Sequence, residues 1–232
     1  MRKTLITLFI IAHTTCFATY YSQCGQDKFV NETYFKNLRD GVFVDIGAHD
    51  GISISNTYFF EKELGWTGIC VEPIPRIFKQ LKKNRNCILV KGCVSDWSGT
   101  GQFYMINGYC EMLSGLVNKF DPRHVNRINY EIAASGSQCS YNIINVKCYL
   151  FNELMEKHGI THINFLSLDT EGGEFDIIST IDFSRYQIDV ITLEDNYGDS
   201  RFIPFLEQKG FTFVRSLDQD LVFVNKNFAP SE

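Results

Sequence analysis

The ten residues 42–51, VFVDIGAHDG, decide the fold. The apolar run Val42–Ile46 is typical of a buried strand, and it ends at a glycine. Gly47 and Gly51 allow a sharp turn and a close approach of the backbone to a ligand, whose polar end the N–H groups of the turn can face. The spacing differs from the Gly-x-Gly-x-x-Gly pattern of dinucleotide sites. Asp45 instead suits a ligand with an ammonium group, so we expect a cofactor loop in this stretch.

Short β-rich runs alternate with amphipathic stretches on the carboxyl side of this loop, which predicts an α/β fold with a doubly wound, mostly parallel sheet. Two closing strands joined by a short connection predict an antiparallel end to that sheet. Residues 97–142 break the alternation and are too long for a simple connection, so we expect a functional insertion or lid there. The predicted strands are 42–46, 67–71, 87–94, 163–168, 188–193, 211–214 and 221–224.

Acidic residues follow three successive predicted strands, where open parallel sheets bind their ligands. Asp45 is placed to attract an ammonium group, Glu72 to accept hydrogen bonds from both hydroxyls of a ribose, and Asp96 to accept from an adenine amino group. Each acid alone is more often a capping or surface residue. Three of them at successive strand ends favour a nucleoside-containing cofactor.

Residues 1–18 have the pattern of a secretory signal peptide, with Arg2 and Lys3 before a short apolar run and small residues after it. The run is shorter than the roughly 20 residues of a transmembrane helix. We therefore expect an exported chain with one domain over residues 19–232 that is not an integral membrane protein; the alternative is a cytoplasmic chain. The net charge of −5 argues against nucleic acid as a partner.

Two further features bear on export. Asn31-Glu32-Thr33 is a glycosylation sequon, which is meaningful only in a eukaryotic secretory route. Cys110 and Cys139 lie in a polar region where a disulfide is compatible with the pattern, although no spacing in the chain determines a connectivity.

Six short motifs are spread over the chain: Ser22-Gln23 with Gly25-Gln26-Asp27, Phe43 to Ala48, Ser55-Asn56-Thr57, Gly65 to Gly68, Val71-Glu72-Pro73 and Asp169 to Gly172. Together they resemble the FkbM family of methyltransferases over about residues 22–215. The resemblance implies a Rossmann-like class I methyltransferase with a seven-stranded, mostly parallel sheet, an antiparallel last strand and helices on both faces. It implies S-adenosylmethionine as the cofactor and O-methylation of hydroxyls, often on sugars. Transferred to this chain, the cofactor contacts are Asp45, Gly47, Asn56, Glu72 and Asp96, to which we add Ala48 and His49 of the same loop.

Methyl transfer to a hydroxyl needs alignment of the acceptor and a group that removes its proton. Asp169 and Glu171 follow the fourth strand and are the candidate bases. His124, within the insertion, reaches the acceptor if the insertion closes as a lid. In the alternative interpretation Asp169 binds the cofactor, and Glu171 or Glu174 caps the following helix.

Asp169, Asp195 and Asn196 are similar to the metal site of catechol-type O-methyltransferases, which predicts Mg²⁺ as a second cofactor. The leading hypothesis is an O-methyltransferase for a small-molecule or glycan acceptor. The group that we expect it to methylate is a hydroxyl on a carbohydrate or glycoconjugate. A second hypothesis is a non-catalytic interaction protein of the secretory pathway that keeps the fold. A third is a methyltransferase for nitrogen or carboxylate acceptors, which would need no metal.

Overall fold

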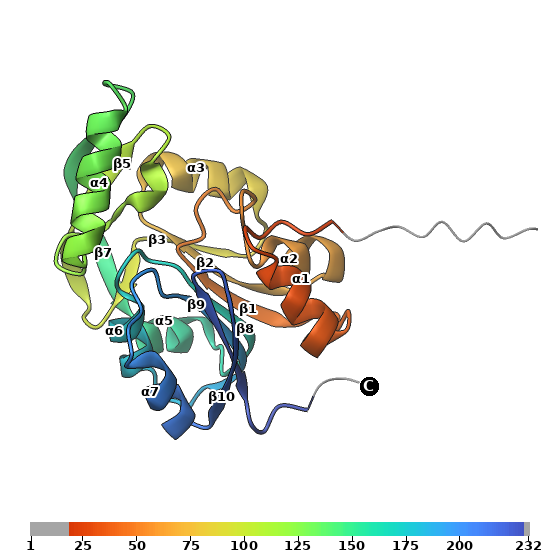
Figure 1. Ribbon diagram of the computed structural model, residues 1–232. Coiled ribbons are helices and arrows are strands. Elements are labelled where there is room, and N and C mark those ends of the chain that lie inside the picture. The colour runs from red at the N-terminus through yellow and green to blue at the C-terminus, as the bar shows by residue number, and fades with distance from the viewer. Residues whose placement is uncertain (1–18, 230–232) are drawn as a thin grey trace, which may run out of the picture.

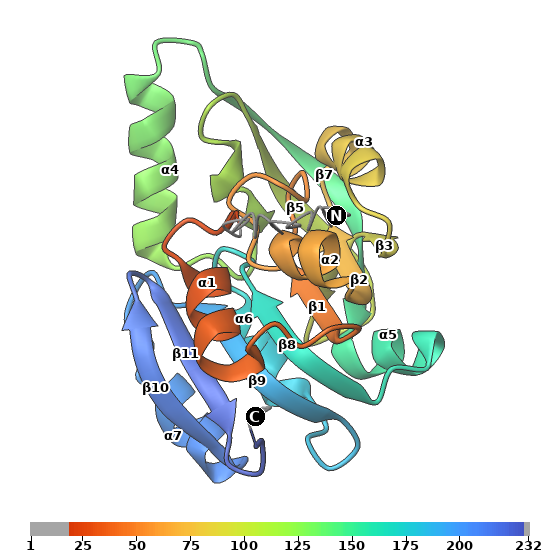
Figure 2. The ribbon, with the colours of Figure 1, turned by 90° about the vertical axis from the view of Figure 1, so that its right-hand side faces the viewer.

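The computed structural model describes residues 19–229, and Figures 1 and 2 show them from two sides. The predicted signal peptide, residues 1–18, lies outside the described residues. Within the described range, no helix is long and apolar enough to cross a membrane.

A seven-stranded sheet carries the fold, with the order β10-β11-β9-β8-β1-β2-β3. Its neighbours pair in parallel except at β11, which runs antiparallel to both β9 and β10. This order confirms the predicted doubly wound sheet and its antiparallel end. The strands are β1 (Val42–Ile46), β2 (Thr67–Glu72), β3 (Ile88–Lys91), β8 (His162–Leu168), β9 (Gln187–Glu194), β10 (Phe211–Leu217) and β11 (Asp220–Asn225).

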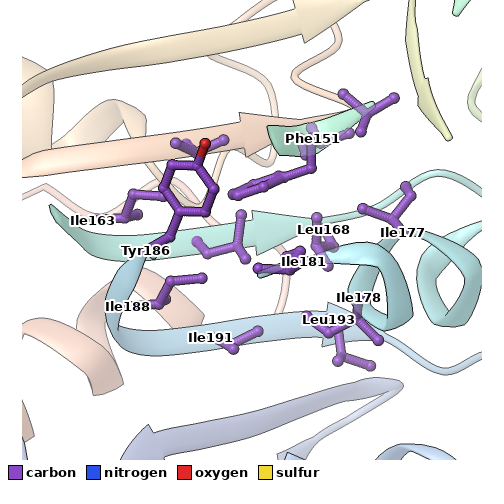
Figure 3. Packing of buried hydrophobic residues seen from close by; sticks show 14 of the residues in the cluster. Phe151, Ile163, Leu168, Ile177, Ile178, Ile181, Tyr186, Ile188, Ile191 and Leu193 are labelled. Carbon is purple, nitrogen blue, oxygen red and sulfur yellow. The ribbon is translucent and has the colours of Figure 1, made fainter. Parts of the chain in front are cut away.

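Helices cover both faces of this sheet, as predicted, because successive side chains of each strand point to opposite faces. Val44 joins the apolar cluster that α5, α6 and α7 cover, part of which Figure 3 shows. Phe43 joins the aromatic cluster on the other face, beneath α1 and α2. The helices of the two faces are α1 (Gln26–Val30) with a π-helical turn (Asn31–Phe35), α2 (Tyr58–Leu64), α3 (Pro75–Asn84), α5 (Phe151–His158), α6 (Glu174–Thr180) and α7 (Phe202–Gln208).

Residues 97–150, which we call the cap, form a structure of their own beside the main sheet. A second sheet with the order β4-β7-β5-β6 carries them. The helix α4 (Pro122–Ala134) stands at one end of the molecule next to β5 (Figures 1 and 2). The other elements of the cap are β5 (Gly99–Asn107), a 3₁₀ turn (Glu111–Leu113), β6 (Gly115–Leu116) and β7 (Ser140–Leu150), and β4 (Cys93–Ser95), directly before the cap, completes the second sheet.

The prediction of a single third strand over 87–94 is wrong. The chain leaves the main sheet at Gly92, and Cys93–Ser95 pair with β7 in the second sheet. Gly92 has φ +152°, and a Cβ there would lie 2.4 Å from the backbone oxygen of Lys147. The switch between sheets thus depends on a contact with a residue 55 positions later in the chain, which local apolarity does not reveal.

Two residues that the sequence places on the surface are buried. The spacing of the basic residues 76–85 predicts a solvated face, yet the Arg85 side chain is 0% exposed. Asn31, the acceptor of the sequon, is 1% exposed and donates hydrogen bonds to Tyr20 Oη (3.1 Å) and Asn37 Oδ1 (3.0 Å). The folded chain therefore offers no accessible asparagine at this sequon.

Candidate active site

A pocket opens where β1, β2 and β8 end, between the main sheet and the cap. It encloses about 750 Å³, part of it open to solvent. The predicted residues Gly47, His49, Glu72, Asp169 and Glu171 all line it. Apolar lining comes from Ile46, Val71, Pro73, Ile74, Cys93, Val94, Phe103, Met112 and Leu116. An apolar pocket with one buried carboxylate and a separate acidic group suits a nucleoside that carries a cationic end.

The cofactor loop is shaped by its contacts with neighbouring strands. Gly47 has φ +94°, and a Cβ there would lie 1.7 Å from the backbone oxygen of Asp169, so only glycine fits. The N–H groups of Gly47 and Ala48 both donate to the Val71 carbonyl, at 3.1 and 3.0 Å. The expectation that these groups face a ligand is therefore wrong, since β2 already occupies them. Ala48 packs in the aromatic cluster, and His49 alone of the three turns a side chain into the pocket.

Glu72 lies as predicted, at the end of β2 and in the pocket wall. It is 4% exposed, and one carboxylate oxygen accepts a hydrogen bond from the Ile74 N–H at 2.6 Å. Burial raises the pKa of Glu72 to about 8. The carboxylate thus has acceptor capacity left in an apolar setting, where ribose hydroxyls would bind it strongly.

Asp45 and Asn56 do not line the pocket. The Asp45 carboxylate accepts a hydrogen bond from Thr57 Oγ1 at 2.5 Å and lies 3.9 Å from Arg85 Nη1, beneath the cofactor loop. Asn56 Nδ2 donates to Ser167 Oγ at 3.1 Å, next to the end of β8. Both residues hold the loop and the strands that carry the site, and their direct contact with cofactor stays a prediction.

Asp96 also lies outside the pocket wall. Its carboxylate accepts from Ser95 Oγ at 3.1 Å and lies 2.8 Å from the Lys119 ammonium, and these partners hold its pKa below the ordinary value despite partial burial. Lys119 itself does line the pocket. The place expected for an acid facing adenine is thus occupied by an ion pair between the main domain and the cap.

Three carboxylates meet at the ends of β8 and β9. Potential ligand oxygens of Asp169, Glu171 and Glu194 lie within 4.8 Å of one another. Burial, and after it the charge of Asp220, raise the pKa of Asp169 to about 8. Burial and the charge of Asp169 raise the pKa values of Glu171 and Glu194 well above their ordinary values. Like charges this close cannot all stay ionised, so the cluster shares protons or binds a cation.

Of the predicted metal trio, Asp169 lies in the cluster and Asn196 contacts it, whereas Asp195 is engaged in its own loop. Asp195 Oδ1 accepts from the Asp199 N–H at 2.7 Å, and Asn196 Nδ2 donates to Glu171 Oε2 at 3.3 Å. Glu194, one residue earlier and still within β9, joins Asp169 instead. Adjacent residues near a strand end point in different directions. The sequence alone therefore does not show which of the three residues 194–196 faces Asp169.

Residues 45–223 match the family model of the methyltransferase FkbM domain. The chain belongs to the FkbM family of methyltransferases. It is therefore an S-adenosylmethionine-dependent methyltransferase, as the motifs predict. A comparison with curated proteins gives no significant match.

Glu174 of this FkbM methyltransferase is the first residue of α6 and does not cap that helix, whose start has no side-chain cap. Its carboxylate accepts hydrogen bonds from the Thr170 N–H (2.7 Å) and the Gly172 N–H (3.0 Å), which fixes the loop between β8 and α6. Glu171 in the same loop has φ +59°, a left-handed conformation that turns its side chain toward the pocket.

His124 reaches the site from the cap. Its Nδ1 lies 3.0 Å from Tyr197 Oη and 3.4 Å from Glu171 Oε2, and its Nε2 lies 3.0 Å from the Leu113 carbonyl. Burial lowers its pKa. Because a carbonyl only accepts, Nε2 carries the proton, and the neutral ring can then accept from Tyr197. Both nitrogens are engaged, so this geometry suits a residue that holds Tyr197 and the turn at Leu113 together better than a base that meets the acceptor.

Two polar contacts that the sequence did not predict tie the cap to the main domain of the FkbM methyltransferase. Glu111 lies 3.3 Å from His49 Nε2 and forms an ion pair with Arg76 of α3. Lys119 bridges Asp96 and Asp176. Glu111 and Lys119 both line the pocket, so the cap closes one side of it.

A second, more open cleft adjoins the pocket and measures about 1220 Å³, including open solvent. Its walls come from the start of α4, the loop before α6 and the loop after β9. Aromatic side chains lie among many charged and amide groups. The aromatic residues are Phe120, Phe175, Tyr197 and Phe202; the polar ones include Asp121, Arg123, Glu174, Asp176, Glu194, Asp195, Asn196 and Arg201.

Proposed function

We propose that this FkbM methyltransferase methylates a hydroxyl of a carbohydrate or glycoconjugate and uses the Asp169–Glu171–Glu194 cluster to accept the hydroxyl proton. One observation carries the proposal: the cluster lies between the two cavities. Asp169 and Glu171 line the cofactor pocket, whereas Glu194 lines the second cleft. A proton acceptor at that boundary stands where an acceptor from one side would meet a methyl donor from the other.

The cofactor pocket suits S-adenosylmethionine. Glu72 would accept from the ribose hydroxyls, and the apolar residues around Ile74, Val94 and Leu116 would hold the base. The cofactor supplies an electrophilic methyl group. The protein supplies alignment and a carboxylate whose raised pKa makes it a stronger base than an ordinary one.

The second cleft supports a hydroxyl-rich acceptor. Carbohydrates are bound by many hydrogen-bonding groups together with aromatic surfaces that contact the apolar faces of the sugar ring. Tyr197 offers such a ring, held by the Arg123 guanidinium 4.8 Å from its centroid. The carboxylates and amides around it are acceptors and donors for hydroxyls.

The test has two parts. Calorimetric titration of residues 19–232 with S-adenosylmethionine establishes cofactor binding. Formation of S-adenosylhomocysteine is then followed with sugars, glycoconjugates, amines and carboxylic acids as acceptors. Glu171→Gln should lower turnover with a hydroxyl acceptor at least about 100-fold while leaving cofactor affinity within a few-fold. Glu207→Gln, a change at an exposed position of α7, is the matched control.

The outcomes separate the hypotheses. Turnover with amines or carboxylic acids but not with hydroxyls contradicts the proposal. A folded protein that binds no cofactor favours the non-catalytic interaction protein instead.

The same carboxylate cluster is also tested for Mg²⁺ binding. Oxygen ligands with space for water are what Mg²⁺ prefers, and Asp169, Glu171 and Glu194 offer three carboxylates. Loss of turnover in chelator, restored by Mg²⁺, supports magnesium at this cluster. Full turnover in chelator assigns the cluster to proton transfer alone.

A further inference from the structure

Cysteines gather in pairs in this protein. Seven cysteines fall within the described residues, and six of them lie beside another cysteine. The remaining one, Cys24, lies near the Asp218 carboxylate, at 3.5 Å. The pairs are Cys70 with Cys87 (Sγ–Sγ 3.5 Å), Cys93 with Cys148 (Cα partners in β4 and β7) and Cys110 with Cys139 (Sγ–Sγ 2.8 Å).

The third pair differs from the other two in its surroundings. Cys70, Cys93 and Cys148 lie within strands of the two sheets and Cys87 directly precedes β3, where a thiol packs as an ordinary small apolar group. Cys110 and Cys139 instead lie in connecting segments, one before the 3₁₀ turn and one before β7. The neighbouring Tyr109 is 60% exposed, so the pair lies just beneath the surface. Its sulfurs lie 2.8 Å apart, compared with 3.5 Å for Cys70 and Cys87.

We propose that Cys110 and Cys139 form a disulfide that covalently closes the cap. The two residues are 29 positions apart, and the ring that the bond would close includes β6 and α4. Hydrogen-bonded pairing of β5 with β7 runs to Asn107 opposite Ser140, so the backbone already holds both cysteines at one end of the ladder. Oxidation therefore needs little rearrangement of the backbone.

The oxidant is a small disulfide such as glutathione disulfide. The Cys139 thiolate attacks one of its sulfurs and releases one glutathione thiolate, which leaves a mixed disulfide on Cys139. The Cys110 thiol then loses its proton and displaces the second glutathione. The two protein thiols thus lose two protons and two electrons in all, and glutathione disulfide is reduced to two glutathione molecules.

The local environment supports this order of steps. Burial disfavours a thiolate at Cys139, but hydrogen bonds from the Cys110 thiol, from backbone N–H groups and from Ser135 outweigh it and lower the pKa of Cys139. Burial, and after it the contact with Cys139, raise the pKa of Cys110 to about 11. Cys139 is therefore the better nucleophile of the two.

The bond would act on the cofactor pocket. The 3₁₀ turn directly after Cys110 carries Glu111, which contacts His49 of the cofactor loop, and Leu113, whose carbonyl lies 3.0 Å from His124. The disulfide would hold this turn, and with it one wall of the pocket, in place. Reduction should loosen the wall and weaken cofactor binding several-fold.

Peptide mapping tests the bond directly. The protein is produced in an oxidising compartment, equilibrated with glutathione disulfide, alkylated without reduction and digested with trypsin. Cys139 falls in peptide 128–147, and Cys110 falls in peptide 92–119 together with Cys93. We expect the two peptides to be joined, with fragmentation placing the link on Cys110. Full alkylation of both cysteines, or a link from Cys139 to Cys93, overturns the proposal.

Thermal unfolding gives an independent readout. Closing a loop of this length corresponds to a rise of about 10 °C in Tm. Reductant should remove that rise from the native protein and from Cys24→Ser, the matched control. The double variant Cys110→Ser with Cys139→Ser should have the Tm of the reduced native protein, and reductant should not change that Tm. An equal effect of reductant on the double variant would assign the shift to another pair and refute the inference.

Discussion

Replacing Arg85 by methionine tests whether this buried cation stabilises the carboxylates beneath the cofactor loop. The guanidinium is 0% exposed and lies under the cofactor loop. It donates to Glu61 Oε2 at 2.6 Å, to Thr57 Oγ1 at 3.0 Å and to the Gly51 carbonyl at 3.2 Å, and it is the counter-charge of Asp45 at 3.9 Å. Methionine keeps much of the volume but leaves two carboxylates buried without a cation.

The expected cost follows from that imbalance. Removing one partner of a buried ion pair costs about 3–5 kcal/mol, because the other charge stays buried. Domains of this size are stable by about 5–15 kcal/mol, so the change removes a large share. The corresponding fall in Tm is roughly 6–20 °C. Arg85→Lys keeps the charge but not the fork of donors, so its loss should be smaller.

Urea unfolding followed by circular dichroism measures the change in the free energy of unfolding. Lys83→Met, at an exposed position in the last turn of α3, is the control and should stay within about 0.5 kcal/mol of the native protein. A loss below about 1 kcal/mol for Arg85→Met, with an unchanged slope of unfolding free energy against urea, would refute the argument. It would show that Asp45 and Glu61 are stable without the guanidinium.

Four further outcomes follow from the site. Glu72→Gln should weaken S-adenosylmethionine binding about 10–150-fold by calorimetry, since each hydrogen bond to a charged group contributes about 1.5–3 kcal/mol. Unchanged affinity would show that the ribose does not bind at Glu72. Turnover should rise up to tenfold per pH unit and level off near pH 8, because Asp169, with a pKa of about 8, must lose its proton; a flat profile from pH 6 to about pH 9 would exclude this base. The cofactor-free protein should lose stability as the pH rises from about 5 to 8 in thermal melts. Its folded state holds protons on Glu72 and Asp169 that the unfolded chain releases near pH 4.5 and 3.8, at about 1.4 kcal/mol per proton and pH unit. Gly47→Ala should abolish cofactor binding and lower Tm, because its Cβ would lie 1.7 Å from the Asp169 backbone oxygen; near-native binding would show that the loop can shift.

Local pattern was sufficient for the framework of this protein. Apolar runs ending in glycine or an acid predicted the strands, and strands that end at one edge of a parallel sheet bring those ends together. Gly47, Glu72 and Asp169 accordingly line one pocket. The FkbM motifs predicted the family that the comparison confirms.

The cap contacts could not be predicted in the same way. Glu111 and Lys119 lie in a segment without clear periodicity, and their partners are His49, Arg76, Asp96 and Asp176, far away along the chain. Tyr197 offered no signal beyond its place after β9. An ion pair between side chains of different helices, strands or loops produces no periodic pattern in the sequence.

By itself the sequence determined the fold class and the family, because these depend on strand periodicity and on short motifs. Only the tertiary structure decided what each charged group faces. The spacing of the basic residues 76–85 predicts that Arg85 is a surface cation. In the structure it follows the last residue of α3, lies beneath the loop after β1 and is the counter-charge of a buried acid. Burial and pairing arise from segments that are distant along the chain, and a side chain's charge state and role depend on those neighbours.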